Sequence, residues 1–416
     1  MSDADALNVW HEQHLVGHLW RNPPGAIGFR YDSDWLARGF AVSRSLPLAA
    51  REFPAEGGAA HRFFANLLPE GTVREHLVRD LKLPNTDFDL LRAIGGECAG
   101  ALSILPVDQR PSLERHYHAL TKQDLIDLVA RRGPIYAAWP AEERPRLSLA
   151  GAQNKCPVLL RDDHYFLPQR EAPSSHILKF ELADYRHLPA YETFTTQLAG
   201  AIGLPVVNIT LRLIGQTRYV EIARYDRVQN EHGEVQRLHQ EDFCQALGYG
   251  HEKKYQEHGG PSFAQCYRLL LEVSSEPAID AQHLLRWQIF NVLAGNSDGH
   301  AKNLSLLHIS AEGVRLAPFY DLVCTRAIER IDPHLALDVG GERNPSVITM
   351  AHWEEFARVC EVRPQFLRKL VQETAAGLLE QLGPVREEFQ ARHGDYRSLQ
   401  RIERIVSRQC RCIVKE

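Results

Sequence analysis

Several features that would place this chain in a specialised class are absent from its sequence. No apolar run is long enough for a transmembrane helix, and no apolar segment of a secretory signal follows the polar, acidic residues 1–6. The eight cysteines form no CxxC pair, and the twenty histidines show no HExxH or comparable spacing, so neither a zinc site nor a disulfide framework is indicated. We therefore expect a cytoplasmic protein with reduced thiols and no membrane association.

Charge of either sign is in no large excess. The chain has 48 lysines and arginines against 53 aspartates and glutamates, a formal net charge of −5. This balance argues against broad, nonspecific binding of nucleic acid by the chain as a whole. Its 416 residues are enough for two or three domains, each with a core.

The hydrophobic periodicity changes along the chain from strand-rich to helix-rich. We predict an α/β subdomain over residues 1–106, a linker over 106–115, a strand-rich lobe over 121–240 and a helical lobe over 241–416. Strands are predicted at 15–20, 26–31, 101–105, 157–161, 175–180, 206–214, 217–222 and 304–308, and helices at 59–67, 72–82, 88–94, 121–132, 188–202, 241–247, 262–273, 278–294, 352–360, 365–382 and 398–410. This order predicts an α+β fold of two lobes with a cleft between them.

A polar loop at residues 296–303 lies between a predicted buried helix and a predicted strand. Within it, Asp298 and Asn303 are five positions apart. The aspartate that orients the attacking hydroxyl and the asparagine that holds magnesium have this separation in the catalytic loop of protein kinases. Asp321 follows a strand-like segment, where a kinase has its second metal-binding aspartate. The alternative is that Asp, Asn, Gly and Ser simply make turns here.

Two upstream segments could bind a nucleotide. The small residues of 146–155, just before a strand, would let backbone N–H groups approach phosphates, although a plain tight turn is the better explanation of this segment taken alone. Lys179 ends an apolar strand, as the phosphate-binding lysine of kinases does, and Glu192 on the next predicted helix could be its acidic partner. A surface lysine with a buried stem is the alternative.

The final predicted helix carries a row of arginines on one face. Arg401, Arg404, Arg408 and Arg411 recur at helical spacing. Such a row is usually a solvated face, and a contact with a partner or a phosphate is the alternative.

Taken together, these motifs resemble those of the HipA-type toxin kinases, the serine/threonine kinase half of a bacterial toxin–antitoxin pair. The resemblance rests on residues 45–48, 63–69, 88–91, 148–155, 176–179, 224–227, 240–242, 298–303 and 318–321, and so covers nearly the whole chain. It implies a protein-kinase-like, two-lobed α+β fold, with an extra N-terminal α/β subdomain on the strand-rich N-lobe and a helical C-lobe.

The resemblance also implies a role for each matching residue. Asp298 would be the catalytic base, and Asn303 and Asp321 would hold magnesium. Ser148 would be the site of autophosphorylation that switches the kinase off, because a phosphate of about −2 charge on a phosphate-binding loop repels ATP. The residues implied to bind the nucleotide are Ala150, Gly151, Ala152, Gln153, Asn154, Lys155, Lys179, Arg224, Tyr225, His300, Lys302, Asn303, Tyr320 and Asp321.

The cofactors and partners implied by the resemblance are ATP, Mg²⁺, a helix-turn-helix antitoxin of the HipB type and a protein substrate, an aminoacyl-tRNA synthetase. The chain departs from the family pattern at two places. Ala223 stands where the resemblance leads us to expect glutamate, and residues 338–349 carry only Arg343 where some family members have a lysine-rich stretch that touches DNA. We therefore expect contact with DNA mainly through the antitoxin.

Two other functions are compatible with parts of the sequence. A nucleotide-binding corepressor without catalysis is the first, but the retention of Lys179, Asp298, Asn303 and Asp321 speaks against it. A kinase acting on a small molecule or lipid is the second, but it would have no need of the subdomain at 1–106.

Overall fold

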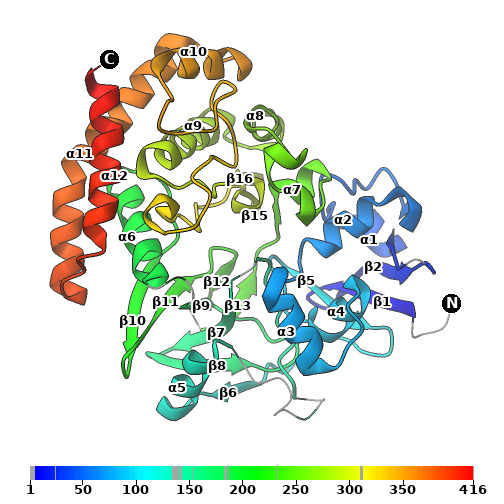
Figure 1. Ribbon diagram of the computed structural model, residues 1–416. Helices are drawn as coiled ribbons and strands as arrows, with labels where there is room; N and C mark the ends of the chain where they lie inside the picture. Colours follow the sequence, from blue (N-terminus) through cyan, green and yellow to red (C-terminus); the bar gives the residue numbers. More distant parts are fainter. Residues whose placement is uncertain are drawn as a thin grey trace. The chain divides into compact units, whose positions relative to one another are not determined.

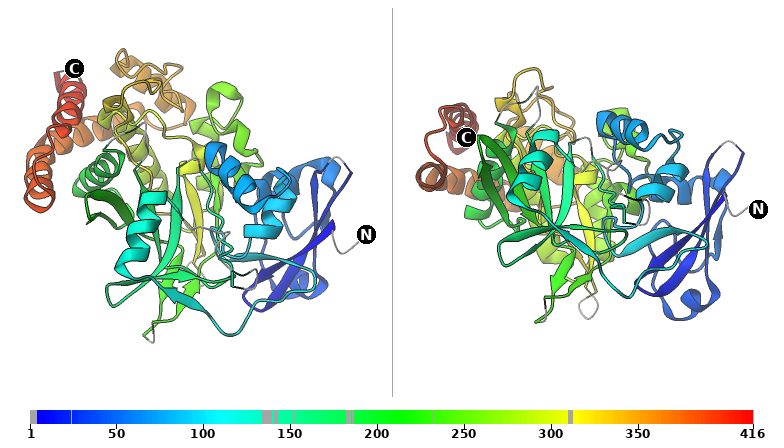
Figure 2. Two further views of the ribbon diagram at one scale, coloured as in Figure 1. Left: turned by 60° about the horizontal axis from the view of Figure 1, so that its bottom comes forward. Right: turned by 90° about the horizontal axis from the view of Figure 1, so that it is seen from below.

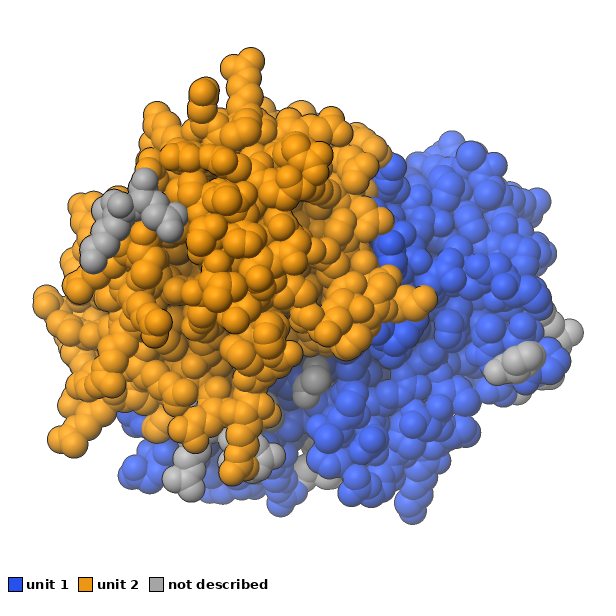
Figure 3. Space-filling model, turned by 45° about the horizontal axis from the view of Figure 1, so that its top comes forward, with its two compact units in different colours: residues 1–180, 213–252, 307–309 blue, residues 181–212, 253–306, 310–416 orange. Residues whose placement is uncertain are grey.

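The structure is a computed structural model that describes residues 5–23, 25–133, 140, 143–151, 153–181, 185, 187–231, 233–309 and 313–415. It divides into two compact units, which Figure 3 shows in different colours. Unit 1 comprises residues 1–180, 213–252 and 307–309, and unit 2 comprises residues 181–212, 253–306 and 310–416. Both strands and helices are present, so the fold class is α+β, as predicted. Within the described ranges, no helix is long and apolar enough to cross a membrane.

Unit 1 begins with a five-stranded antiparallel sheet in the order β4-β3-β2-β1-β5 (Figure 1). Its strands are β1 (Ala6–His11), β2 (His14–Arg21), β3 (Ile27–Tyr31), β4 (Glu52–Phe53) and β5 (Leu102–Pro106). Alternate strand residues such as Leu7, Val9 and Phe29 are buried in one core with Phe63 and Phe64, because successive strand side chains point to opposite faces. The accompanying helices are α1 (Ser33–Arg38), η2 (Ala55–Gly57), α2 (Ala59–Ala65), α3 (Gly71–Leu81) and α4 (Asp87–Ile94).

A second sheet has six strands, and the five that lie wholly in unit 1 follow one another in the order β11-β9-β7-β8-β6, with β10 (Ile209–Ile214) next to β11. These strands are β6 (Tyr117–Ala119), β7 (Lys155–Arg161), β8 (His164–Pro168), β9 (His176–Phe180) and β11 (Thr217–Ala223). The helix α5 (Lys122–Arg131) begins at a capping box of Thr121 and Asp124 and buries Leu128 and Val129 against the sheet, in a core with Leu178. The predicted strands at 157–161, 175–180 and 217–222 are therefore confirmed.

The rest of unit 1 consists of short elements. The strands β12 (Arg227–Gln229) and β13 (Val235–Arg237) form a hairpin, and β14 (Gln240–Asp242) leads into α7 (Phe243–Leu247). The helix predicted from residue 241 begins two residues later, because Asp242 caps it with extended backbone and a side chain that accepts from the Gln245 N–H. Glu241 is buried and accepts hydrogen bonds from the Ser43 hydroxyl and the Arg44 N–H, which joins the motif at 240–242 to the residues directly before the motif at 45–48.

Unit 2 is mostly helical (Figures 1 and 2). Its helices are α6 (Leu188–Ala201), η5 (Gln256–His258), α8 (Phe263–Val273), α9 (Pro277–Ala294), η6 (Ala301–Asn303), η7 (Thr325–Ala327), α10 (Met350–Val359), α11 (Pro364–His393) and α12 (Leu399–Lys415). The elements η4 (His251–Lys253), β10 (Ile209–Ile214) and β15 (Ser305–Ile309) have residues in both units, and β16 (Gly313–Leu316) is in unit 2.

The central helix of unit 2 is α9. Its apolar side chains, among them Leu284, Trp287, Phe290 and Leu293, are buried on more than one side, because α8, α11 and α12 all pack against it. Pro277 stands in its first turn, and Gly295 ends it in the left-handed conformation at φ 75°. This packing fixes the point at which the polar loop 296–303 leaves the helix.

The helices α11 and α12 lie side by side, as Figures 1 and 2 show. The structure extends α11 well beyond the predicted end at 382, through Pro384. Val385 and Phe389 on that extension are buried, so packing outweighs the local effect of the proline. Arg401, Arg404, Arg408 and Arg411 are all exposed on α12, opposite buried Ile402, Val406 and Cys410. The predicted one-sided row of arginines is confirmed.

Candidate active site

The loop 296–303 holds one exposed acid between buried neighbours. Asp298 is exposed, whereas Asn296 and Ser297 before it and Gly299 and His300 after it are buried. The Ser297 N–H donates to Thr325 Oγ1 at 2.8 Å, and its hydroxyl donates to the Pro333 carbonyl at 2.7 Å. A fixed loop thus presents the Asp298 carboxylate at the surface of unit 2, as a group that acts on a large substrate requires.

A tyrosine that sequence reasoning missed contacts this acid. The Tyr255 hydroxyl donates to Asp298 Oδ1 at 2.8 Å. The Tyr255 ring also meets the His300 ring edge to face, with centroids 5.2 Å apart and an interplanar angle of 84°. No local pattern connects Tyr255 to a loop more than forty residues away, so only the tertiary structure reveals the contact.

The structure brings together the two side chains predicted to hold magnesium. Asn303 ends η6, and its Nδ2 donates to Asp321 Oδ2 at 3.3 Å. The Asn303 Oδ1 atom is buried and has no hydrogen-bond partner among the described residues. Amide and carboxylate oxygens are the ligands that Mg²⁺ prefers, so these two residues fit a magnesium ion. Asp321 has φ 60°, a left-handed conformation that is uncommon outside glycine and is concentrated at functional sites.

Tyr320 connects Asp321 to the loop 296–303. Its hydroxyl donates to the Lys302 carbonyl at 2.8 Å and lies 2.8 Å from Ser305 Oγ. His300 and Lys302 are buried in the same part of unit 2. Six of the predicted site residues, 298, 300, 302, 303, 320 and 321, therefore belong to one connected region of unit 2.

In unit 1, two of the predicted nucleotide-binding residues are lysines paired across neighbouring strands. Lys155 on β7 lies directly opposite Lys179 on β9 in the antiparallel register, so both side chains project from the same face of the sheet. Like charges at such a position are destabilising unless an anion compensates them. The Lys155 ammonium donates to the Ala150 carbonyl at 2.7 Å. Lys179 is only 5 % exposed, which rules out the alternative of a surface lysine.

The loop before β7 is docked within unit 1. Ser148 is fully buried; its N–H donates to the Glu97 carbonyl at 2.8 Å, and its hydroxyl donates to the Leu67 carbonyl at 2.8 Å. Gly151, at φ 112°, accepts from the Glu70 N–H at 3.1 Å, in a conformation that favours glycine.

The end of this loop is tied to strand β9. The Gln153 side chain donates to the Phe180 carbonyl at 3.2 Å, and the Asn154 carbonyl accepts from the Phe180 N–H at 3.4 Å. Ala152 lies outside the described residues, so its predicted role stays a prediction.

The Arg224 side chain is engaged within the protein. Its guanidinium is buried and pairs with Glu97 at 2.9 Å and Asp226 at 2.8 Å. Burial opposes the ionisation of Glu97, but the coulombic effects of Arg224, Arg227 and Arg237 and the hydrogen bond from the Ser174 N–H together outweigh it and lower the pKa of Glu97 to about 2. Any nucleotide contact at Arg224 would therefore come from its backbone. The hydroxyl of Tyr225, the other residue predicted there, donates to Gln240 Oε1.

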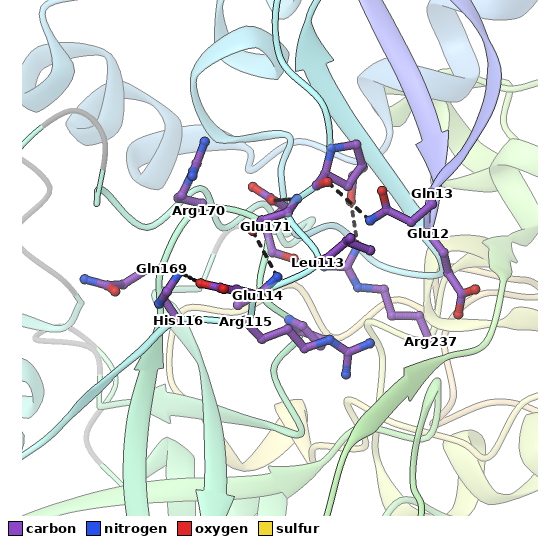
Figure 4. A pocket seen from close by; sticks show the side chains of 15 residues that line it. Glu12, Gln13, Leu113, Glu114, Arg115, His116, Gln169, Arg170, Glu171 and Arg237 are labelled. Carbon is purple, nitrogen blue, oxygen red and sulfur yellow. Dashed lines mark hydrogen bonds and ion pairs between the residues drawn. The ribbon is translucent and has the colours of Figure 1, made fainter.

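Unit 1 also has a cavity of about 220 Å³, and none of the predicted site residues within the described ranges lines it (Figure 4). Three arginines and three glutamates contribute to its wall, so the cavity selects neither an anion nor a cation. Glu171 there accepts from the Ser112 N–H at 2.6 Å, and Arg237 donates to Ser103 Oγ at 2.6 Å. The first bond attaches the segment after β5 to the residues that follow β8, and the second attaches β13 to β5.

Comparison with known proteins assigns the chain to a family. The family profile described as the HipA N-terminal domain matches residues 7–105, and the profile described as the HipA-like C-terminal domain matches residues 147–382. The chain belongs to the HipA family. The sequence resemblance is thereby confirmed, and with it the prediction of a serine/threonine protein kinase.

Individual relatives of this HipA family member agree with the assignment. A protein of Sinorhizobium fredii described as a putative kinase is 35% identical over 388 residues, which are 92% of each chain. The serine/threonine-protein kinase toxin HipA of Shewanella oneidensis is 31% identical over 370 residues, 84% of this chain and 82% of the relative. The solved complex of Shewanella oneidensis HipA, HipB and operator DNA contains a chain that matches with a TM-score of 0.84 and 26% identity, over 98% of this chain and 97% of that one.

Proposed function

We propose that this HipA family kinase is the toxin of a toxin–antitoxin pair and transfers the γ-phosphoryl group of ATP, with magnesium, to a serine or threonine hydroxyl of a protein. The observation that carries the proposal is the geometry of unit 2. An exposed acid, Asp298, stands on a loop held by hydrogen bonds, and two side chains with oxygen ligands, buried Asn303 and partly buried Asp321, follow it. The order and chemistry of these groups match the kinase catalytic loop and metal site.

The nucleotide and the metal would be held mainly by charge. Asn303 Oδ1 and the Asp321 carboxylate would bind magnesium, which when bound neutralises charge on the phosphates. Lys155 and Lys179 project from one face of their sheet and would bind phosphate oxygens through their ammonium groups.

The proposed reaction is an in-line displacement on phosphorus. The substrate hydroxyl oxygen forms a bond to the γ-phosphorus while the bond from that phosphorus to the bridging oxygen of ADP breaks. Asp298 accepts the proton of the hydroxyl. Such help is typically a factor of about 10² to 10⁴ in rate, and positioning of the reactants supplies much of the remainder.

We also propose that autophosphorylation of Ser148 is an off switch. The Ser148 hydroxyl gives its single hydrogen to the Leu67 carbonyl, and the side chain is fully buried. A phosphoserine there would have no hydrogen to donate and would place about −2 charge against that carbonyl oxygen in a buried site. The loop 148–154 could not remain docked, and the residues that would cover the nucleotide would leave with it.

The proposed partners follow from the family. The Shewanella relative was solved with HipB and operator DNA, and we propose a HipB-type helix-turn-helix antitoxin for this chain, with DNA contacted mainly through that antitoxin. An aminoacyl-tRNA synthetase is the proposed substrate, because its modification would stop translation. The cytoplasmic location stays a prediction.

The proposal is tested by incubating the purified protein with ATP and magnesium and then measuring intact mass and mapping peptides. We expect one added phosphate, at Ser148, and none in Asp298→Asn, which should fold normally because Asp298 is exposed. Transfer by Asp298→Asn at a rate near that of wild type would show that Asp298 is not the base. If unmodified wild-type protein binds ATP but never transfers phosphate, the function is instead that of a noncatalytic, nucleotide-binding corepressor.

A further inference from the structure

The residues before α8 form a tight turn that carries Tyr255. The Tyr255 carbonyl accepts from the N–H groups of His258 at 3.1 Å and Gly260 at 3.0 Å. Gly259 has φ 77°, and a Cβ atom on Gly260 would lie 2.1 Å from the Lys253 carbonyl oxygen, so both positions require glycine. The two hydrogen bonds to the Tyr255 carbonyl hold the backbone of the turn at the residue that carries the side chain.

A second segment of unit 2, residues 335–343, holds this turn. The Gln256 N–H donates to the Ala336 carbonyl at 3.3 Å, and the Gln256 side chain both accepts from the Asp338 N–H, at 3.2 Å, and donates to the Asp338 carboxylate. Glu257 forms an ion pair with Arg343. All of these bonds are made by Gln256 and Glu257, the two residues directly after Tyr255.

The same segment is bonded to the catalytic loop. The Ala336 N–H donates to the Ser297 carbonyl at 2.9 Å, directly before Asp298. The residues that precede Asp298 and the turn that carries Tyr255 are thus both attached at Ala336. The hydrogen bond of 2.8 Å from the Tyr255 hydroxyl to Asp298 Oδ1 is a second, direct connection between the turn and the loop.

We propose that Tyr255 is a positioning residue that holds the Asp298 carboxylate in one rotamer for phosphoryl transfer, an inference that rests on the proposed kinase function. An exposed aspartate rotates among several rotamers, of which only some can reach the substrate hydroxyl. The hydrogen bond to Oδ1 selects one of them. A neutral donor on a carboxylate also favours its ionised form, which keeps the base unprotonated before the substrate arrives.

The alternative is that the bond only stabilises the turn, and Tyr255→Phe distinguishes the two. This change keeps the ring against His300 and removes only the hydroxyl. We expect kcat for transfer from ATP to fall by about 10-fold to 10²-fold, because a small displacement of a reacting group has effects of that order. The KM for ATP should stay within about twofold, and the acidic limb of the pH–kcat profile should move to higher pH.

The matched control is Tyr191→Phe, which removes another tyrosine hydroxyl of unit 2, one that donates to the Ser398 carbonyl at 3.5 Å. It should leave kcat and the pH profile unchanged. The double variant Tyr255→Phe/Asp298→Asn should be no slower than Asp298→Asn alone, because Tyr255 acts through Asp298. A ring-fluorinated tyrosine at position 255 keeps the fold and has a more acidic hydroxyl, so it should move the acidic limb to lower pH.

The outcomes separate this inference from the proposed function. If Asp298→Asn is inactive while Tyr255→Phe matches wild type in kcat and in pH profile, the positioning role is wrong and the kinase assignment stands. An equal fall in Tyr191→Phe would also refute it, because the effect would then not be specific to Asp298. If the wild-type protein transfers no phosphate, the proposed function fails and the role of Tyr255 fails with it.

Discussion

The buried carboxylate of Glu97 offers the most quantitative test of how unit 1 is held together. Glu97 is completely buried and pairs with Arg224 and Arg227, both at 2.9 Å, and it accepts two further bonds from Ser174. The change Glu97→Gln keeps the size of the side chain and removes its charge. Two buried guanidinium groups would then share the negative charge of Asp226 alone, which pairs with each of them.

The loss of the free energy of unfolding in Glu97→Gln can be worked out in two ways. Breaking a buried pair by removing one partner typically costs about 3–5 kcal/mol. The arginines lower the pKa of Glu97 from its ordinary 4.5 to about 2, against the opposing effect of burial. At about 1.4 kcal/mol for each pKa unit, this fall corresponds to roughly 3 kcal/mol. Both routes predict that Glu97→Gln loses roughly 3 kcal/mol of the free energy of unfolding at pH 7.

The sign of the pH dependence follows from the lowered pKa. In wild type, the contribution of the Glu97 charge is fully present above pH 4.5 and is lost as the pH falls from 4.5 towards 2. The variant lacks this titration, so its disadvantage at pH 7 should shrink across that window. Urea unfolding, followed by far-UV circular dichroism at several pH values, measures both effects.

Glu52→Gln is the matched control in the same unit, because Glu52 is about half exposed and pairs only loosely with Arg30, at 4.0 Å. It should change the free energy of unfolding by less than about 1 kcal/mol. The reasoning would be refuted if Glu97→Gln lost no more stability than Glu52→Gln at pH 7, or if its disadvantage were as large at pH 3 as at pH 7.

Two further predictions concern the proposed metal site and the proposed switch. Asn303→Ala removes a buried oxygen atom beside Asp321, so we expect half-maximal activity to need at least about tenfold more magnesium, with recovery at high magnesium concentration. A magnesium titration of the phosphate transfer rate measures this change, and an unchanged titration would exclude Asn303 as a ligand. Ser148→Ala removes the hydroxyl that donates to the Leu67 carbonyl and that would be phosphorylated, so we expect no self-inactivation during prolonged incubation with ATP. Protein kinase activity should persist after wild-type activity has stopped, and activity that decays equally in both proteins would place the off switch elsewhere.

Sequence patterns predict most accurately the helices and strands that strong local signals determine. The helix α9 was expected at 278–294 and is found at 277–294, because its long apolar run and its glycine stop are both local signals. Strands of two or three residues, such as β4 and β6, were missed because they are too short to show a period. The strand β1 was also missed, although its pairing with β2 and β5 places it inside the first sheet. Pairing between distant segments, and not local propensity, creates such elements.

The candidate site was predictable where function requires fixed spacing along the chain. Asp298 and Asn303 are five residues apart in the sequence, so a motif can reveal them. Tyr255 and Glu97 reach their partners only through the tertiary structure. In the sequence, Glu97 is one charged residue among many, and nothing local shows that it is buried and paired with arginines from another part of the chain.

The complete burial of Ser148 has a consequence for timing. Under the proposed switch, the serine can be phosphorylated only after its loop has opened, so that opening precedes the chemistry. The lifetime of the active toxin then depends on the local stability of the docked loop, because the frequency of loop opening limits the rate of self-inactivation. Sequence changes that loosen the backbone at Leu67 or Glu97, whose carbonyls hold Ser148, would then shorten the toxic period.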